Sequence, residues 1–116
     1  MRSTSHPAEL CPRYHRAVEL IGRRWTGAIV RTLLGGPRRF NELLSAVPGI
    51  SDRLLTERLR ELERAKIVRR EVYPESPVRV VYELTDSGRE LGPALNELGR
   101  WAERWIDISE EEQQAP

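Results

Sequence analysis

Residues 52–64 carry arginine, threonine and glutamate at spacings suited to contact with nucleic acid. On a helix, Leu55, Leu59 and Leu62 would form one apolar stripe. The opposite face would carry five charged or hydroxyl side chains, namely Arg53, Thr56, Glu57, Arg60 and Arg64. Arginine pairs with the acceptors of guanine, glutamate with the amino group of cytosine, and threonine with a thymine methyl group or a phosphate. The pattern is typical of a helix that reads DNA, although an ordinary solvated helix face has a similar composition.

We expect the N-terminal half of this stretch to make the DNA contacts, because that half of a DNA-reading helix reaches the base edges. Its candidate residues are Arg53, Thr56, Glu57 and Arg60. Ser51 precedes the stretch and is placed to cap the helix with its hydroxyl group. An exposed helix N-terminus also receives phosphates, so Ser51 stays a candidate for DNA contact as well.

Three more arginines are candidates for contacts with the DNA backbone. Arg38 and Arg39 precede a short helical pattern, and a role in surface solubility is the alternative. Arg79 lies near the tip of a predicted hairpin, where its target would be a phosphate or a minor-groove edge. The adjacent Arg69 and Arg70 fall in an extended segment, so at most one of them can face the DNA.

Cys11 is the one cysteine of the chain, so no internal disulfide can form. It precedes Pro12 at the expected start of a helix, with Arg13, His15 and Arg16 nearby, and these surroundings favour a reactive thiol. A small, half-buried cap or dimer-contact residue is the alternative role. Cys11 and His15 lack the third group that a catalytic pair needs, and with His6 they make only three metal ligands. We therefore predict no enzyme activity, metal site or cofactor.

A helical seam near the C-terminus is suited to pairing with another helix. Its apolar positions alternate in steps of four and three residues, with one tryptophan beside them: Leu91, Leu95, Leu98, Trp101, Ala102 and Trp105. Such a narrow seam is typical of paired helices, and large aromatic side chains anchor interfaces. We expect a homodimer built on this seam together with the first helix, so that the N- and C-terminal helices both serve dimerisation. The alternative is a last helix that folds back on its own domain.

Length and composition point to one small domain. The chain has 116 residues, of which 39% are hydrophobic and 32% charged, a mixture that supports a folded core. Residues 1–70 hold 15 basic and 7 acidic side chains, whereas residues 71–116 hold 4 and 11. The excess of basic residues in 1–70 suits a polyanionic partner such as double-stranded DNA. No stretch resembles a membrane span or a secretory signal, so we expect a cytoplasmic protein without membrane contact.

The apolar pattern predicts four helices, a hairpin and a last helix. The helices are expected at about 12–21, 25–34 and 40–47 and from 52 to about 66, the hairpin at 68–84, and the last helix, capped by Thr85, at 85–108 with a kink or restart at Pro93. Residues 1–10 are predicted to be a flexible leader and 109–116 a disordered acidic tail. This order of helices and hairpin is typical of a mostly helical α+β winged helix-turn-helix domain, here at 11–108. Within it we expect a DNA-binding core at 25–84 and a dimerisation helix at 85–108.

Four stretches resemble the HxlR-type family of winged helix-turn-helix regulators, which is related to the MarR group. They read CPRYHRAVELIGRRWTGAIVRTLL, GPRRFNELLSAVPGISDRLLTERLRELERAKIVRR, YPESPVRVVYELTDSGREL and LGRW, and together they span about residues 11–101. The resemblance implies a homodimeric DNA-binding transcriptional regulator, commonly a repressor or activator of neighbouring genes. It also implies that an oxidant or electrophile could act through Cys11. A small-molecule effector is the other possibility.

Two functions are therefore weighed for this chain. The first is a sequence-specific regulator that binds a pseudo-palindromic operator as a homodimer. The alternative is a winged-helix module that binds protein and not DNA. A protein-binding helix would expose more apolar surface than the arginine-rich face of residues 52–64. The residue types therefore favour DNA.

Overall fold

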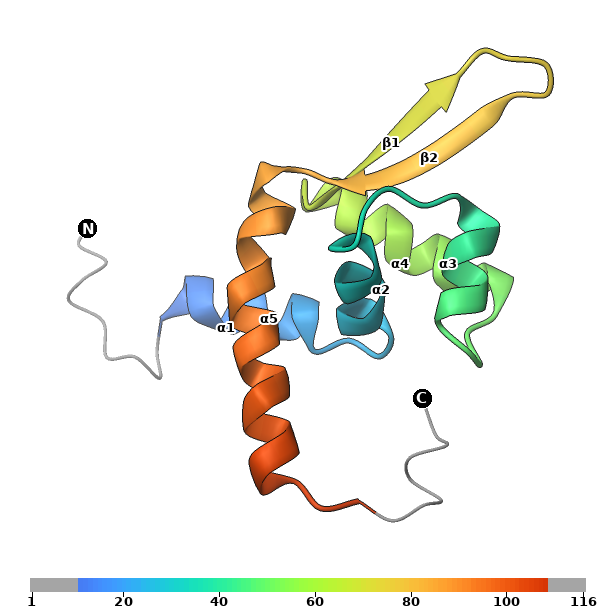
Figure 1. Ribbon diagram of the computed structural model, residues 1–116. Coiled ribbons are helices and arrows are strands. Elements are labelled where there is room, and N and C mark those ends of the chain that lie inside the picture. The colour runs from blue at the N-terminus through green and yellow to red at the C-terminus, as the bar shows by residue number, and fades with distance from the viewer. Residues whose placement is uncertain (1–10, 109–116) are drawn as a thin grey trace.

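The computed structural model describes residues 11–108 and confirms the predicted winged helix-turn-helix order (Figure 1). Its elements are α1 (Pro12–Ile21), α2 (Thr26–Leu33), α3 (Phe40–Ala46), α4 (Asp52–Arg64), β1 (Val68–Tyr73), β2 (Arg79–Leu84) and α5 (Asp86–Trp105). The expected leader at 1–10 and tail at 109–116 lie outside the described residues.

Local side-chain chemistry explains where the helices begin. Pro12 opens α1, where its missing N–H costs no hydrogen bond. The hydroxyl of Ser51 accepts a hydrogen bond from the Leu54 amide at 3.1 Å and caps α4. Thr85 caps α5 by accepting from the Gly88 amide at 3.2 Å. Both caps were expected from the sequence.

The last helix is continuous through Pro93, so of the predicted kink or restart the restart does not occur. It ends at Trp105, before the predicted end at about Ile108. Proline removes one helical hydrogen bond, but the turns on either side are fixed by packing. Gly92 is buried against Leu34, and Leu95 is buried in the core. These tertiary contacts stabilise the helix on both sides of Pro93, so it remains continuous.

The core lies between α2, α3, α4 and the base of the hairpin. Its fully buried members are Ile29, Val30, Leu43, Leu55, Leu59 and Leu62. In a winged helix-turn-helix, this packing fixes α4 relative to α2 and α3. Because the leucine stripe of α4 faces inward, the opposite side of that helix is left on the surface.

The hairpin projects beyond the helical body, as Figure 1 shows. Its strands pair antiparallel from Val68 opposite Leu84 to Tyr73 opposite Arg79. Arg38 forms an isolated antiparallel bridge with Tyr82 on the other side of β2. The Arg38 amide donates to the Tyr82 carbonyl at 2.9 Å, and the Arg38 carbonyl accepts from the Tyr82 amide at 2.8 Å. This bridge fixes the segment before α3 to the base of the hairpin.

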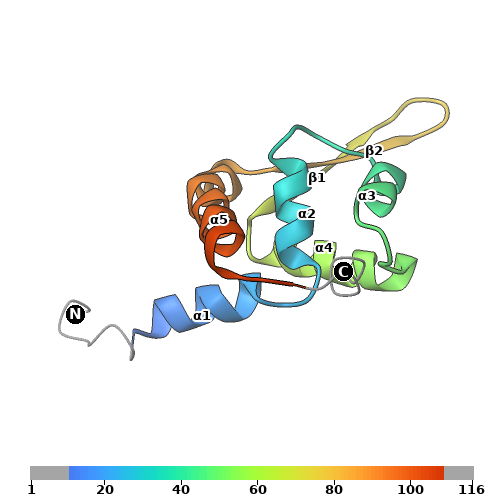
Figure 2. The same cartoon turned by 60° about the horizontal axis from the view of Figure 1, so that its bottom comes forward.

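In contrast, α1 extends away from the body (Figure 2). None of its ten residues is buried within the chain. Tyr14 and Val18 are 63% and 50% exposed. An isolated helix of this length is marginal in water, so α1 gains most from a further packing partner.

Candidate nucleic-acid interface

The helix α4 presents a charged outer face opposite its buried leucines. Arg53 and Glu57 form an ion pair at 2.9 Å along this face. The Thr56 hydroxyl donates to the Asp52 carbonyl at 2.9 Å, which leaves its oxygen lone pairs for a further partner. Arg60 is exposed. The four predicted reading residues thus lie on the surface side of one helix, as their spacing required.

Arg58 was not among the predicted functional residues, and the structure gives it a positioning role. It is 7% exposed. Its Nε donates to the Arg24 carbonyl at 3.1 Å, and its guanidinium pairs with Glu61 at 3.3 Å. Glu61 also lies 3.5 Å from Arg23, so α4 is connected to the turn between α1 and α2. The signal was present in the sequence, since Arg58 falls on the flank of the helix beside the leucine stripe.

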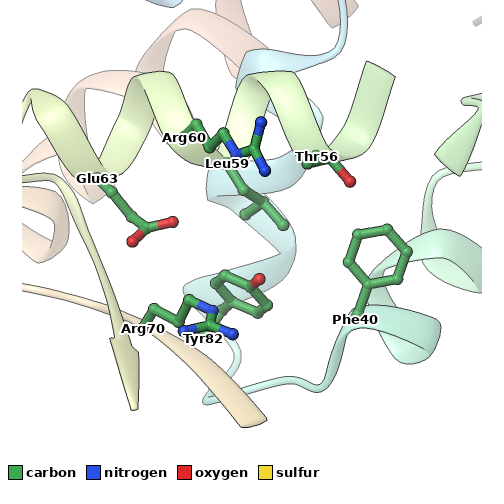
Figure 3. Close-up of a pocket in the computed structure, with 7 residues that line it drawn as sticks. All are labelled: Phe40, Thr56, Leu59, Arg60, Glu63, Arg70 and Tyr82. Carbon is green, nitrogen blue, oxygen red and sulfur yellow. The ribbon is translucent and has the colours of Figure 1, made fainter. Parts of the chain in front are cut away.

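A groove of about 450 Å³ separates α4 from the base of the hairpin (Figure 3). It is lined by Phe40, Thr56, Leu59, Arg60, Glu63, Arg70 and Tyr82. Arg60 and Glu63 come from α4, and Arg70 faces them from β1. Within residues 11–108, none of these three side chains forms a hydrogen bond or an ion pair. The two guanidinium groups are therefore available to an anionic ligand.

The two neighbouring arginines of β1 have different surroundings. Arg69 lies opposite Glu83 and forms ion pairs with Glu83 and Glu71. These carboxylates, Glu83 first, raise the pKa of Arg69. Arg70 lies opposite Tyr82 and lines the groove. The alternation rule predicted that at most one of the two could face the DNA side, and the strand register singles out Arg70 as the one beside α4.

Arg79 has partners within the hairpin itself. Its guanidinium pairs with Glu75 at 2.9 Å and lies 4.1 Å from the ring centroid of Tyr73. The hydrogen bond with Glu75 raises the pKa of Arg79 and lowers the pKa of the Glu75 carboxyl group. A DNA phosphate would have to compete with Glu75 for this arginine.

The remaining predicted phosphate contacts lie directly before α3 and α4 in the chain. Arg38 is bridged to Tyr82 through its backbone, and its guanidinium donates to the Pro37 carbonyl at 3.0 Å. Arg39 is exposed, and its amide donates to Glu42 at 2.7 Å at the start of α3. The structure thus brings Arg38 close to the groove through Tyr82, whereas Ser51 lies at the N-terminus of α4.

The predicted dimer seam divides into two parts. Leu95 is 8% exposed and belongs to the core of its own domain, and Leu91 packs against that core. Leu95 is thus covered within its own chain and Leu91 is partly covered, and the interface role of the seam stays a prediction. Leu98, Trp101 and Trp105 are 58%, 53% and 67% exposed.

Cys11 is partly buried at the position before α1. Its backbone carbonyl accepts from the His15 amide at 3.1 Å, but its side chain makes no capping hydrogen bond. The thiol is therefore not needed to close the helix end. Among residues 11–108, no cluster of histidine, cysteine and carboxylate side chains could hold a metal ion, and no helix is long and apolar enough to cross a membrane.

An arginine-bearing helix packed as the second member of a helix-turn-helix, followed by a hairpin wing, defines a winged helix-turn-helix transcriptional regulator. Residues 20–110 match the family described as HxlR-like helix-turn-helix. The chain belongs to this family. Its relatives are named as transcriptional regulators and not as enzymes.

Two Bacillus subtilis (strain 168) regulators are among the similar proteins. The uncharacterized HTH-type regulator YvaP is 49% identical over 102 residues, which cover 88% of this chain and 94% of YvaP. YodB is 43% identical over 98 residues, which cover 84% of this chain and 88% of YodB.

Solved structures show the same fold. The reduced form of YodB matches with a TM-score of 0.79 and 42% identity, over 87% of this chain and 99% of that one. YodB has also been solved after diamide treatment and with bound quinone, with TM-scores of 0.73 and 0.74. A MarR-family structure from Porphyromonas gingivalis W83 matches with a TM-score of 0.77 and 29% identity, over 87% of this chain and 98% of that one.

Proposed function

We propose that this regulator binds double-stranded DNA as a homodimer, with α4 of each subunit in the major groove. The observation that carries the proposal is the surface face of α4, which presents Arg53, Thr56, Glu57 and Arg60 opposite a fully buried leucine stripe. Ser51, Arg38, Arg39 and Arg79 are the candidates for contacts with the DNA backbone around that helix.

The proposed dimer contact combines the second half of α5 with α1. Leu98, Trp101 and Trp105 are more than half exposed, as is Tyr14 of α1. Side chains of this size on a soluble domain indicate an interface when they gather on one surface. A two-fold dimer would place its two reading helices about 34–36 Å apart and bind a pseudo-palindromic site.

The test is selection of bound sequences from a random DNA duplex pool, followed by affinity measurements. We expect a pseudo-palindromic consensus with half-sites about one helical turn apart. Arg60→Ala should lose about 1–3 kcal/mol of binding free energy at the consensus and relax the preference at one base pair. Arg64→Ala, at the far end of the same helix, is the matched control and should change the preference less.

Two results would contradict the proposal. One is a wild-type protein that binds no duplex above background, which would favour the protein-binding alternative. The other is an Arg60→Ala variant that keeps both its affinity and its sequence preference, which would show that another face reads the DNA.

Regulation through Cys11 is the second part of the proposal. YodB, at 43% identity, has been solved in reduced, diamide-treated and quinone-bound forms. Cys11 lies next to α1, which we place at the subunit contact, so a modified thiol there would re-space the two reading helices. Diamide should therefore change the DNA affinity of the wild type and leave that of Cys11→Ser unchanged. Equal responses of the two proteins would reduce Cys11 to a structural residue.

A further inference from the structure

The groove between α4 and the hairpin contains Arg70, one of the two neighbouring arginines of which the sequence allowed only one to face the DNA. Arg70 projects from β1 into the groove opposite Arg60 and Glu63 of α4, as Figure 3 shows. Its side chain has no partner among residues 11–108. We propose that this groove receives the DNA backbone, and that Arg70 binds a phosphate beside the base edge that Arg60 reads. This inference rests on the proposed placement of α4 in the major groove.

The shape and position of the groove support a backbone contact. Thr56 and Arg60 line the groove and also belong to the proposed reading face, so the groove opens toward the DNA. Phe40, Leu59 and Tyr82 line the groove together with its charged residues. Arginine binds phosphate through two parallel hydrogen bonds, which suits the unpaired guanidinium groups of this groove.

The base of the hairpin holds Arg70 in place. Its cross-strand partner Tyr82 is 9% exposed and is bonded through its backbone to Arg38. The strand β1, which carries Arg70, is thus paired along its length with β2, and β2 is bonded in turn to the backbone of Arg38. A phosphate contact made here would fix the duplex relative to α4, whereas a contact at the projecting hairpin tip would not.

Glu63 supplies the opposing charge in the same groove. Its carboxylate has no ion-pair partner among residues 11–108 and lies one helical turn beyond Arg60. A carboxylate beside a phosphate path lowers affinity by like-charge repulsion. We assign Glu63 the role of limiting how far the backbone extends along the groove toward the C-terminal end of α4.

Arg69 provides a matched control for Arg70. Both are exposed arginines of β1, and removing either changes the net charge by the same amount. Arg69, however, is paired with Glu83 and Glu71. Any difference between the two alanine variants therefore reports the location of the charge and not its loss.

The experiment measures the affinity of the selected operator, and of an unrelated duplex, across a salt series. Arg70→Ala should weaken both duplexes about 5- to 10-fold at ~0.1 M salt and reduce the salt slope by about one unit. Arg69→Ala should leave both near wild type. Glu63→Gln should strengthen both about 2- to 5-fold, because it removes the opposing charge. Arg70→Lys should keep the salt slope and lose part of the affinity.

The outcomes separate this inference from the proposed function. If Arg60→Ala relaxes the sequence preference while Arg70→Ala matches Arg69→Ala, the helix reads DNA but the groove does not hold the backbone, and the inference is overturned. If the wild type binds no duplex, the proposed function fails first. Thermal unfolding of each variant checks the fold, and Glu63→Gln tests the groove without removing an arginine.

Discussion

Two surfaces of this domain differ in what they leave exposed. The side formed by α4 and the hairpin presents arginines, of which Arg60 and Arg70 have no partner among residues 11–108. The side formed by α1 and the second half of α5 presents large apolar side chains, with Trp105 67% exposed. Exposed arginine suits a polyanion, whereas exposed tryptophan suits a protein surface. The difference teaches that one small domain can divide its surface between two kinds of partner.

The helix α5 contributes both to the core and to the apolar surface. One face of its first half is buried, with Gly88 packed directly against the carbonyl oxygen of Ile67, the residue before β1. In its second half Leu98, Trp101 and Trp105 are more than half exposed. A single amphipathic stripe therefore serves the core at one end and is free to serve a partner at the other.

The largest expected effect comes from breaking the apolar surface. Leu98→Glu combined with Trp105→Glu should yield monomers and lower operator affinity by about 10²–10⁴-fold, because two linked half-site contacts become one. Light scattering at micromolar concentration measures the mass, and a binding titration measures the affinity.

A matched control tests whether any exposed apolar residue would give the same result. Val78, in the connection between the strands, is 62% exposed, close to the values for Leu98 and Trp105. Val78→Glu should keep the dimer mass. A wild-type protein with the mass of one chain would contradict the division of the two surfaces.

The next largest effect concerns the contact of α4 with the turn between α1 and α2. Arg58 is buried in α4 and bonds to the turn that follows α1, so Arg58→Ala should lower the free energy of unfolding by about 2–3 kcal/mol. Arg60→Ala, two residues along the same helix, is exposed and should change it by less than about 0.5 kcal/mol. Urea unfolding gives both values, and equal losses would show that Arg58 does not hold α4 in place.

The sequence predicted the element order and both helix caps because these depend on local patterns. The leucine stripe of α4, the alternation in the hairpin and the residues Ser51 and Thr85 all act over a few positions. It did not separate Leu95 from Leu98, since the two lie on one stripe and only the folded structure shows that Leu95 is buried and Leu98 exposed.

The sequence also did not show which arginines have charged or polar partners in the folded structure. Arg58 is buried although charged residues are mostly exposed, because Glu61 and a backbone carbonyl satisfy it. Arg70 could not be chosen over Arg69 before the strand register was known. Local patterns thus indicated the class of site, whereas the partners of each arginine depended on tertiary contacts.

A smaller effect distinguishes the two roles of Ser51. Ser51→Ala should lower the free energy of unfolding by about 1 kcal/mol, because the Leu54 amide loses its partner. Ser51→Asp should restore the cap and so restore the stability. If Ser51 also lies against a phosphate, the added negative charge should weaken operator binding while the stability stays at the wild-type value. Unchanged affinity in Ser51→Asp would leave Ser51 as a cap alone.

The smallest effect is expected at the hairpin tip, where Arg79 already has a carboxylate partner. Arg79→Ala should weaken DNA binding about threefold or less, since the Glu75 pair is exposed and competes with phosphate. Glu75→Gln should strengthen binding by releasing Arg79.

The pKa of Glu75 gives an independent check of this pair. Because Arg79 lowers the Glu75 pKa, the pair is fully formed above the ordinary carboxyl pKa and is lost as the pH falls through the lowered value. An NMR titration of the Glu75 carboxyl group should show its pKa rise in Arg79→Ala. If Arg79→Ala instead weakens binding as strongly as Arg70→Ala, the tip and the groove make equal contacts with the DNA. The paired and unpaired arginines would then no longer mark different parts of the interface.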